Sequence, residues 1–118
     1  MGNIVRLGNS PRWSDVVIHG GVARWVEVAE DSSANAQTQI AQVLQQIDAT
    51  LVQIGSDNTR LLEVLIFLAD LKDAAILNEL WDQWVPRGNL PIRACVQAGL
   101  SAGLRVEMLV TAAVKEPL

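Results

Sequence analysis

The stretch Asn89–Val114 reads NLPIRACVQAGLSAGLRVEMLVTAAV, and its pattern decides the expected fold. Apolar and polar residues alternate on both sides of the Gly99–Gly103 segment, and alternation of this period is typical of β-strands. We therefore predict two closing strands joined by a glycine-bounded turn. A turn centred near Leu100 would set Arg93 directly across from Glu107.

The same alternation predicts which side chains share a face of the sheet. Successive side chains of a strand point to opposite faces, so Arg93 and Cys95 point away from the aliphatic residues between which they lie. If the aliphatic rows of both strands face the helices, then Arg93, Cys95 and Glu107 all lie on the helix-free face.

These three side chains form a candidate site. The Arg93 fork could bind a carboxylate, Glu107 could hold or activate a water, and Cys95 could line the pocket. A purely structural interpretation competes with this one. An arginine and a glutamate across two strands often form a simple salt bridge, and a strand cysteine is usually a small buried hydrophobic residue.

The upstream segments predict two further strands and a long helix. Val16–Ile18 and Val22–Ala29 are β-rich and flank a glycine turn. From Ala36 to Ile54, apolar residues recur at spacings of three and four, which indicates an amphipathic helix that ends at Gly55. Its N-cap is expected among residues 31–33, and its glutamine-rich opposite face is expected to be solvated.

The middle of the chain adds a strand and a second helix. Arg60–Ala69 is almost continuously apolar and favours a strand buried on both faces, with a short helix as the alternative. Asp70 is expected to cap a helix over about 72–84, which ends at Pro86. A short strand at Ile4–Leu7 is a further candidate.

This order, β-β-α-β-α-β-β, predicts an α+β fold: a two-layer sandwich with two helices on one face of the sheet. Residues 1–118 are expected to form a single domain, because this length is near the commonest domain size. Nothing in the chain remains to cover the second sheet face, where Leu109 and Ala113 lie. We therefore expect a second subunit there.

Composition and charge exclude several function classes. The formal net charge is −4 with nine Lys and Arg, which does not suit the neutralisation of nucleic-acid phosphates. No signal pattern and no apolar run of spanning length are present, so we expect a cytoplasmic protein without a membrane partner. One Cys and one His make neither an intrachain disulfide nor a metal cluster, and no cofactor is expected.

The closing motifs resemble those of the Rid family, the YjgF-like reactive intermediate deaminases, also known by the older label L-PSP endoribonuclease. Leu90–Val96 (LPIRACV) resembles the family's Pro-Ala-Arg-Ser/Ala-Cys-Val motif, and Arg105-Val106-Glu107 resembles its Lys/Arg-Val/Ile-Glu motif. Leu77–Trp81 (LNELW) and Val110–Ala113 (VTAA) fall in family order and spacing. The resemblance covers about residues 12–114.

The resemblance implies a chorismate-mutase-like fold assembled as a homotrimer, with clefts between subunits. It implies hydrolysis of small enamines or imines to 2-oxo acids and ammonia. By the same resemblance Arg93 would bind the substrate carboxylate, Glu107 would position the attacking water, and Cys95 would line the cleft.

The chain departs from the family pattern on the second upstream strand. Active members usually carry a small residue followed by Gly-Gln, where this chain has Trp25, Val26 and Glu27. Trp25 and Val26 are therefore expected at the cleft, with more bulk than is usual. The chain also lacks the N-terminal tyrosine, and the role of Arg12 and Ser14 stays open. The alternative function is a catalytically degenerate Rid-like trimer that binds a small carboxylate.

Overall fold

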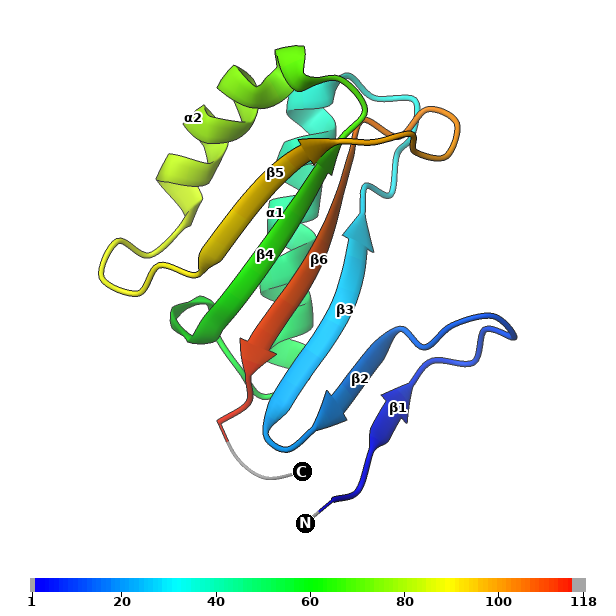
Figure 1. Cartoon of the computed structure of the whole chain (residues 1–118), viewed down its shortest axis with the longest axis vertical. Helices are drawn as coiled ribbons and strands as arrows, with labels where there is room; N and C mark the ends of the chain where they lie inside the picture. Colours follow the sequence, from blue (N-terminus) through cyan, green and yellow to red (C-terminus); the bar gives the residue numbers. More distant parts are fainter. Residues whose placement is uncertain (1, 116–118) are drawn as a thin grey trace.

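Six strands form one sheet, and two helices pack on one of its faces (Figure 1). The computed structural model describes residues 2–115. The strands are β1 (Val5–Leu7), β2 (Val16–His19), β3 (Val22–Val28), β4 (Leu61–Leu68), β5 (Ile92–Gln97) and β6 (Val106–Ala113), and the helices are α1 (Ala36–Gln53) and α2 (Ala74–Trp84). The predicted α+β two-layer sandwich is confirmed, with β1 as an additional strand at one edge.

Helix α1 follows the apolar stripe that its sequence predicts. Ile40, Val43 and Ile47 are fully buried in the core between α1 and the sheet. The expected N-cap among residues 31–33 is wrong, because the Oδ1 of Asn35 accepts the hydrogen bond from the Thr38 amide at 2.9 Å. The predicted stop is confirmed, since Gly55 follows the helix with a φ of +74° that favours glycine.

Helix α2 also begins and ends near its predicted limits. Asp70 accepts a hydrogen bond from the Lys72 amide and caps a short 3₁₀ turn, Leu71–Asp73, that leads directly into α2. The helix ends at Trp84, two residues before Pro86, as expected of a residue that cannot continue a helix. No helix within residues 2–115 is long and apolar enough to cross a membrane.

The strand order is β1-β2-β3-β6-β4-β5, which shows that the predicted closing hairpin is wrong. Strand β5 pairs with β4 in parallel, and β6 lies between β3 and β4 and is antiparallel to both. The physical reason is α2, which connects β4 to β5 as a crossover and returns the chain in the same direction. The Gly99–Gly103 segment then carries the chain over β4 rather than around a tight turn (Figure 1).

The helix-free face of the sheet carries the expected apolar residues, next to an Arg24–Glu63 ion pair. Val26 on β3 pairs with Leu109 on β6, which pairs with Leu65 on β4, and none of the three is buried. On the edge strand β5, Ile92 is 68% exposed and Val96 is 47% exposed. Contiguous apolar surface of this kind marks a contact surface.

A buried glutamine joins two loops at one end of the sheet. The Gln39 amide is fully buried; its Nε2 donates to the carbonyls of Gly103 (2.8 Å) and Ala34 (3.0 Å), and its Oε1 accepts from the Arg105 amide (2.8 Å). The prediction of a solvated glutamine face on α1 is therefore wrong at this position. A buried amide is tolerated because backbone groups satisfy its hydrogen bonds.

We predict that Gln39→Leu lowers the free energy of unfolding by about 2 kcal/mol, because three backbone groups lose the hydrogen-bond partner that the buried Gln39 amide provides, and an unsatisfied group costs about 1–3 kcal/mol. Gln37→Leu is the matched control, since Gln37 is exposed on the same helix. Urea unfolding at equal protein concentration measures both variants. Equal midpoints would contradict the role given to Gln39.

We also predict that Gly103→Ala destabilises the protein by about 1–3 kcal/mol. Gly103 has a φ of +83°, and an added Cβ would lie 2.5 Å from the carbonyl oxygen of Ser32. Gly99→Ala is the control in the same loop, because a Cβ there meets nothing within 4 Å. Thermal unfolding should lower the midpoint for the first variant alone; a similar midpoint for both would refute the close packing.

Candidate functional site

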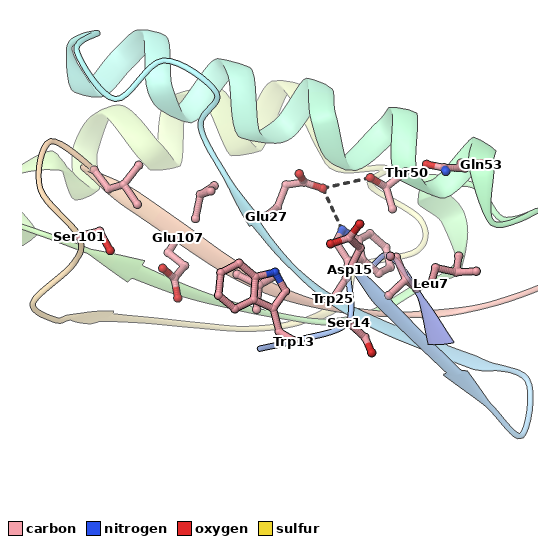
Figure 2. A pocket seen from close by; sticks show the side chains of 15 residues that line it. Leu7, Trp13, Ser14, Asp15, Trp25, Glu27, Thr50, Gln53, Ser101 and Glu107 are labelled. Atoms are coloured by element: carbon pink, nitrogen blue, oxygen red, sulfur yellow. Dashed lines mark hydrogen bonds between the residues drawn. The ribbon is translucent and has the colours of Figure 1, made fainter. Parts of the chain in front are cut away.

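A cavity of about 810 Å³ opens beside the outer edge of β3. Strand β2 pairs with β3 only as far as Arg24, so the segment from Trp25 to Val28 lacks a β2 neighbour. Residues of the 7–16 segment, of α1 and of the loop before β6 surround this free edge (Figure 2). The cavity therefore forms where the sheet is incomplete and side chains from four parts of the chain meet.

The structure places Glu107 and Val26 on the wall of this cavity that the helix-free face provides. Glu107 is half-buried and pairs with Val28 across the β3–β6 ladder. Val26 is 52% exposed. A branched side chain therefore occupies the position at which active members of the resembled family usually carry glycine. Trp13, which is 65% exposed, completes this wall with an indole ring (Figure 2).

Trp25 lies on the other face of β3. It is 4% exposed, belongs to the hydrophobic core, and its Nε1 donates to Glu27 Oε1 at 2.9 Å. Trp25, which was expected at the cleft, therefore packs mainly in the core, and its remaining surface lines the cavity. It does not project freely into the open space.

Glu27 lies in the part of the cavity next to α1. Its Oε1 accepts hydrogen bonds from Trp25 Nε1 and from Thr50 Oγ1 (3.1 Å) (Figure 2). Its Oε2 accepts one from Gln46 Nε2 at 3.1 Å. Gln46 also donates to the Val28 carbonyl at 2.7 Å. These donors fix the carboxylate, so it is a rigid part of the cavity wall.

Arg93 and Cys95 face the helices, so the predicted common face with Glu107 is wrong. Arg93 pairs in register with Val64 and Cys95 pairs with Ile66, and both partners are core residues on the helix side. The prediction failed because it assumed that the aliphatic row of β5 faces the helices. In the structure that row points to the helix-free side, where Ile92 and Val96 are exposed.

Helix α2 holds the Arg93 side chain in place. Its Nη2 donates to Asn78 Oδ1 at 2.8 Å, and its guanidinium carbon lies 5.2 Å from the ring centroid of Trp81. A guanidinium at this distance over an indole face is stabilised by a cation–π interaction. Burial raises the pKa of the neighbouring Cys95 thiol, and the Arg93 charge partly offsets this effect, so the thiol is poorly suited to act as a nucleophile.

Arg93 and Glu107 cannot meet within one chain. Glu107 on β6 pairs with Phe67 on β4, and Phe67 pairs with Val96 on β5. Val96 lies three residues after Arg93 on the same strand. Two strand spacings and three residue steps separate their Cα atoms by roughly 14 Å. Their side chains also point to opposite faces of the sheet.

The sequence pattern did not identify several residues around these groups. Trp13, Ser101 and Leu104 line the cavity from loops, and loop residues carry no periodic signal. Ser14 lines it as well, whereas the structure does not place Arg12 there. For Arg93 a signal existed, because Asn78 and Trp81 belong to the LNELW segment that was noted for its spacing. In residues 2–115, no group of three or more His, Cys, Asp or Glu could hold a metal ion.

Comparisons with known proteins agree with this architecture. The family model described as Endoribonuclease L-PSP matches residues 8–114. The RutC family protein YoaB of Escherichia coli is 46% identical over 112 residues, which span 94% of this chain and 98% of YoaB. A YjgF-family protein from Neisseria meningitidis is 38% identical in its crystal structure, with a TM-score of 0.90 and 98% of each chain covered.

A rat protein named 2-iminobutanoate/2-iminopropanoate deaminase is 35% identical over 68 residues, which span 57% of this chain and 49% of the rat protein. The family match extends over nearly the whole described structure and includes both the cavity and the Arg93 strand. The chain therefore belongs to the YjgF, or Rid, family.

Proposed function

We propose that the protein is a Rid-type deaminase that hydrolyses small enamine or imine intermediates to 2-oxo acids and ammonia. The observation that carries this proposal is the state of Arg93. Its guanidinium is held by Asn78 and Trp81, and none of the ion pairs formed by residues 2–115 includes it. A planar fork with free N–H donors is suited to bind a substrate carboxylate bidentately.

Glu107 supplies the second group that the reaction needs. An imine carbon is attacked by water, so the site must remove a proton from that water and return one to the leaving nitrogen. Glu107 would accept the proton as the C–O bond forms and would donate it to the nitrogen of the carbinolamine. The C–N bond then breaks while the carbinolamine hydroxyl returns its proton to Glu107, which gives the 2-oxo acid and ammonia; the released ammonia takes that proton and leaves as ammonium. An enamine enters the same path after it tautomerises to the imine.

The two groups would meet between subunits. Arg93 lies on the edge strand β5. Glu107 lies two strands away on β6, in the cavity beside β3. A homotrimer would bring β5 of one chain to the cavity of the next and would cover the apolar helix-free face with Leu65, Leu109 and Val26. A heterologous interface of this kind closes into a ring.

The rat relative supports the substrate class through its name, which specifies 2-imino acids of three and four carbons. The description of the family model as an endoribonuclease suits this chain less well. Among residues 2–115, those that line the cavity include the carboxylates Asp15, Glu27 and Glu107 and no Lys, Arg or His. An RNA phosphate backbone would be repelled there.

Binding without turnover is a second candidate function, and one observation favours it. Val26 stands in the cavity with half of its surface exposed, where its side chain restricts the approach of a ligand to the β3 backbone. A small carboxylate could then bind to Arg93 without reaching a water held by Glu107. Calorimetric binding of a small carboxylate by a protein that releases no 2-oxo acid would identify this second function.

We predict that the protein accelerates the release of 2-oxo acid from an enamine that an amino-acid dehydratase generates in situ. Arg93→Ala should lower kcat/KM about a hundredfold, because one charged contact to the substrate carboxylate is worth about 2–3 kcal/mol. Arg87→Ala, which removes an exposed arginine from the loop before β5, is the matched control. No acceleration over buffer across several amino-acid substrates would reject the deaminase.

We predict further that two inactive variants complement each other. Arg93→Ala and Glu107→Gln are each expected to retain no more than about one hundredth of the activity, yet a refolded equal mixture should recover about one quarter of the wild-type activity. In a random ring, one in four interfaces receives the intact Arg93 from one chain and the intact Glu107 from the next. Light scattering should give the mass of three chains. A monomer, or a mixture as inactive as its components, would refute the shared site.

A further inference from the structure

A row of polar residues crosses the helix-free face of the sheet. Arg24 on β3 pairs in register with Thr111 on β6, and Thr111 pairs with Glu63 on β4. Because every second residue of a strand lies on the same face, the neighbouring rows on this face can be read from the register. They are apolar on both sides: Val22 with Ala113, and Val26 with Leu109. Two opposite charges therefore lie between apolar rows.

The ion pair within this row is long, and the residue between its members is incompletely satisfied. Arg24 Nη2 lies 3.9 Å from Glu63 Oε1, and the two side chains are 61% and 31% exposed. An exposed pair at this distance contributes little to stability. Thr111 is 8% exposed, and its hydroxyl has no hydrogen-bond partner among residues 2–115. A single chain therefore leaves two charges loosely paired and a buried hydroxyl unpaired.

Contact with another chain on this face changes the balance for the two charges. A subunit that covers Val26 and Leu109 also removes water from Arg24 and Glu63 in the adjacent row. Charges that lose water require partners in close contact, which a separation of 3.9 Å does not provide. Arg24 and Glu63 lie two strands apart, roughly 10 Å between their Cα atoms, so each side chain can turn to a partner from another chain.

We propose that Arg24 of each subunit pairs with Glu63 of the next subunit, so that identical ion pairs close a ring and fix the register in which the sheet faces meet. Each chain supplies one charge of each sign, which makes the face complementary to a copy of itself. The Thr111 hydroxyl lies between the two positions and donates to the arriving carboxylate. This inference rests on the proposed function for the trimer and does not depend on the reaction.

The ring also gives the assembly a means of self-recognition. A shift of one subunit along the face by two residues would place each charge against an apolar row and leave it unpaired. A chain with a different charge pattern at these two positions would meet like charges instead of opposite ones. Like charges at an interface suppress the wrong partner more than opposite charges strengthen the right one.

The charge-swapped double variant Arg24→Glu/Glu63→Arg separates pairing between chains from pairing within one chain. It keeps the net charge and retains one charge of each sign in its own row, so it should fold and form trimers under either arrangement. Wild-type and double-variant chains, one of them with a mass tag, are mixed in equal amounts and refolded. Native mass spectrometry then measures the composition of the trimers.

Pairing between chains predicts that the two kinds of chain sort themselves. Most interfaces of a mixed trimer would place like charges opposite each other, so at least about nine tenths of the trimers should contain one kind of chain only. Pairing within each chain predicts random assembly, in which about one quarter of the trimers contain one kind only. A random composition would overturn the inference, as would a monomeric wild type or a double variant that forms no trimer.

The two single variants give the opposite test. Arg24→Glu leaves a carboxylate at both positions and Glu63→Arg leaves a guanidinium at both, so each chain repels its own copies and attracts the other. In an equal mixture, less than about one twentieth of the trimers should contain one kind of chain only. The matched control mixes Arg87→Glu with Asp82→Arg, which change the net charge by the same amounts at exposed positions and should assemble at random. Equal compositions in the two mixtures would contradict the ring.

These results are independent of the deaminase assay. A trimer that sorts its chains but releases no 2-oxo acid keeps the inference and loses the proposed reaction. An active trimer whose chains mix at random keeps the reaction and loses the inference.

Discussion

The parallel pairing of β4 with β5 is the constraint on which the positions of the site residues depend. Helix α2 connects the two strands, and a strand that returns from such a crossover must run parallel to the first. Strand β5 thereby becomes an edge, and β6 inserts between β3 and β4. The register of β5 then turns Arg93 toward α2, where Asn78 and Trp81 hold it.

Much of the fold followed from periodicity, and the main errors have one physical origin. The apolar stripe of α1, the stop at Gly55 and the continuous apolar run of β4 were predictable because burial repeats at the period of the element. The arrangement of β5 was not, since its alternation is the same beside β6 or beside β4. The strand–helix–strand order of residues 61–97 was the better guide, because it is typical of a parallel pair.

The residue types of the candidate site could be named from the sequence, and their arrangement could not. Its chemical groups were visible as residue types in a spaced motif, but parity cannot decide which face of an edge strand meets solvent. On β5 the aliphatic Ile92 and Val96 are the exposed row, against the usual preference for burial. That inversion has a physical explanation if another subunit covers them. The burial of Gln39 was equally unpredictable, because no hydrophobicity pattern reveals a buried amide that backbone groups satisfy.

The Arg105-Val106-Glu107 segment before and within β6 combines a residue that fixes the loop, a core residue and a residue that lines the cavity. Arg105 donates to the buried Asp73 carboxylate at 2.7 Å, and its amide donates to Gln39, so this residue fixes the loop to both helices. Val106 is fully buried, and Glu107 two residues after Arg105 lines the cavity. Removal of one partner of a buried ion pair lowers the free energy of unfolding by several kcal/mol. The loop that carries Leu104 is therefore held rigidly, and this rigidity gives Glu107 a defined position in the cavity wall.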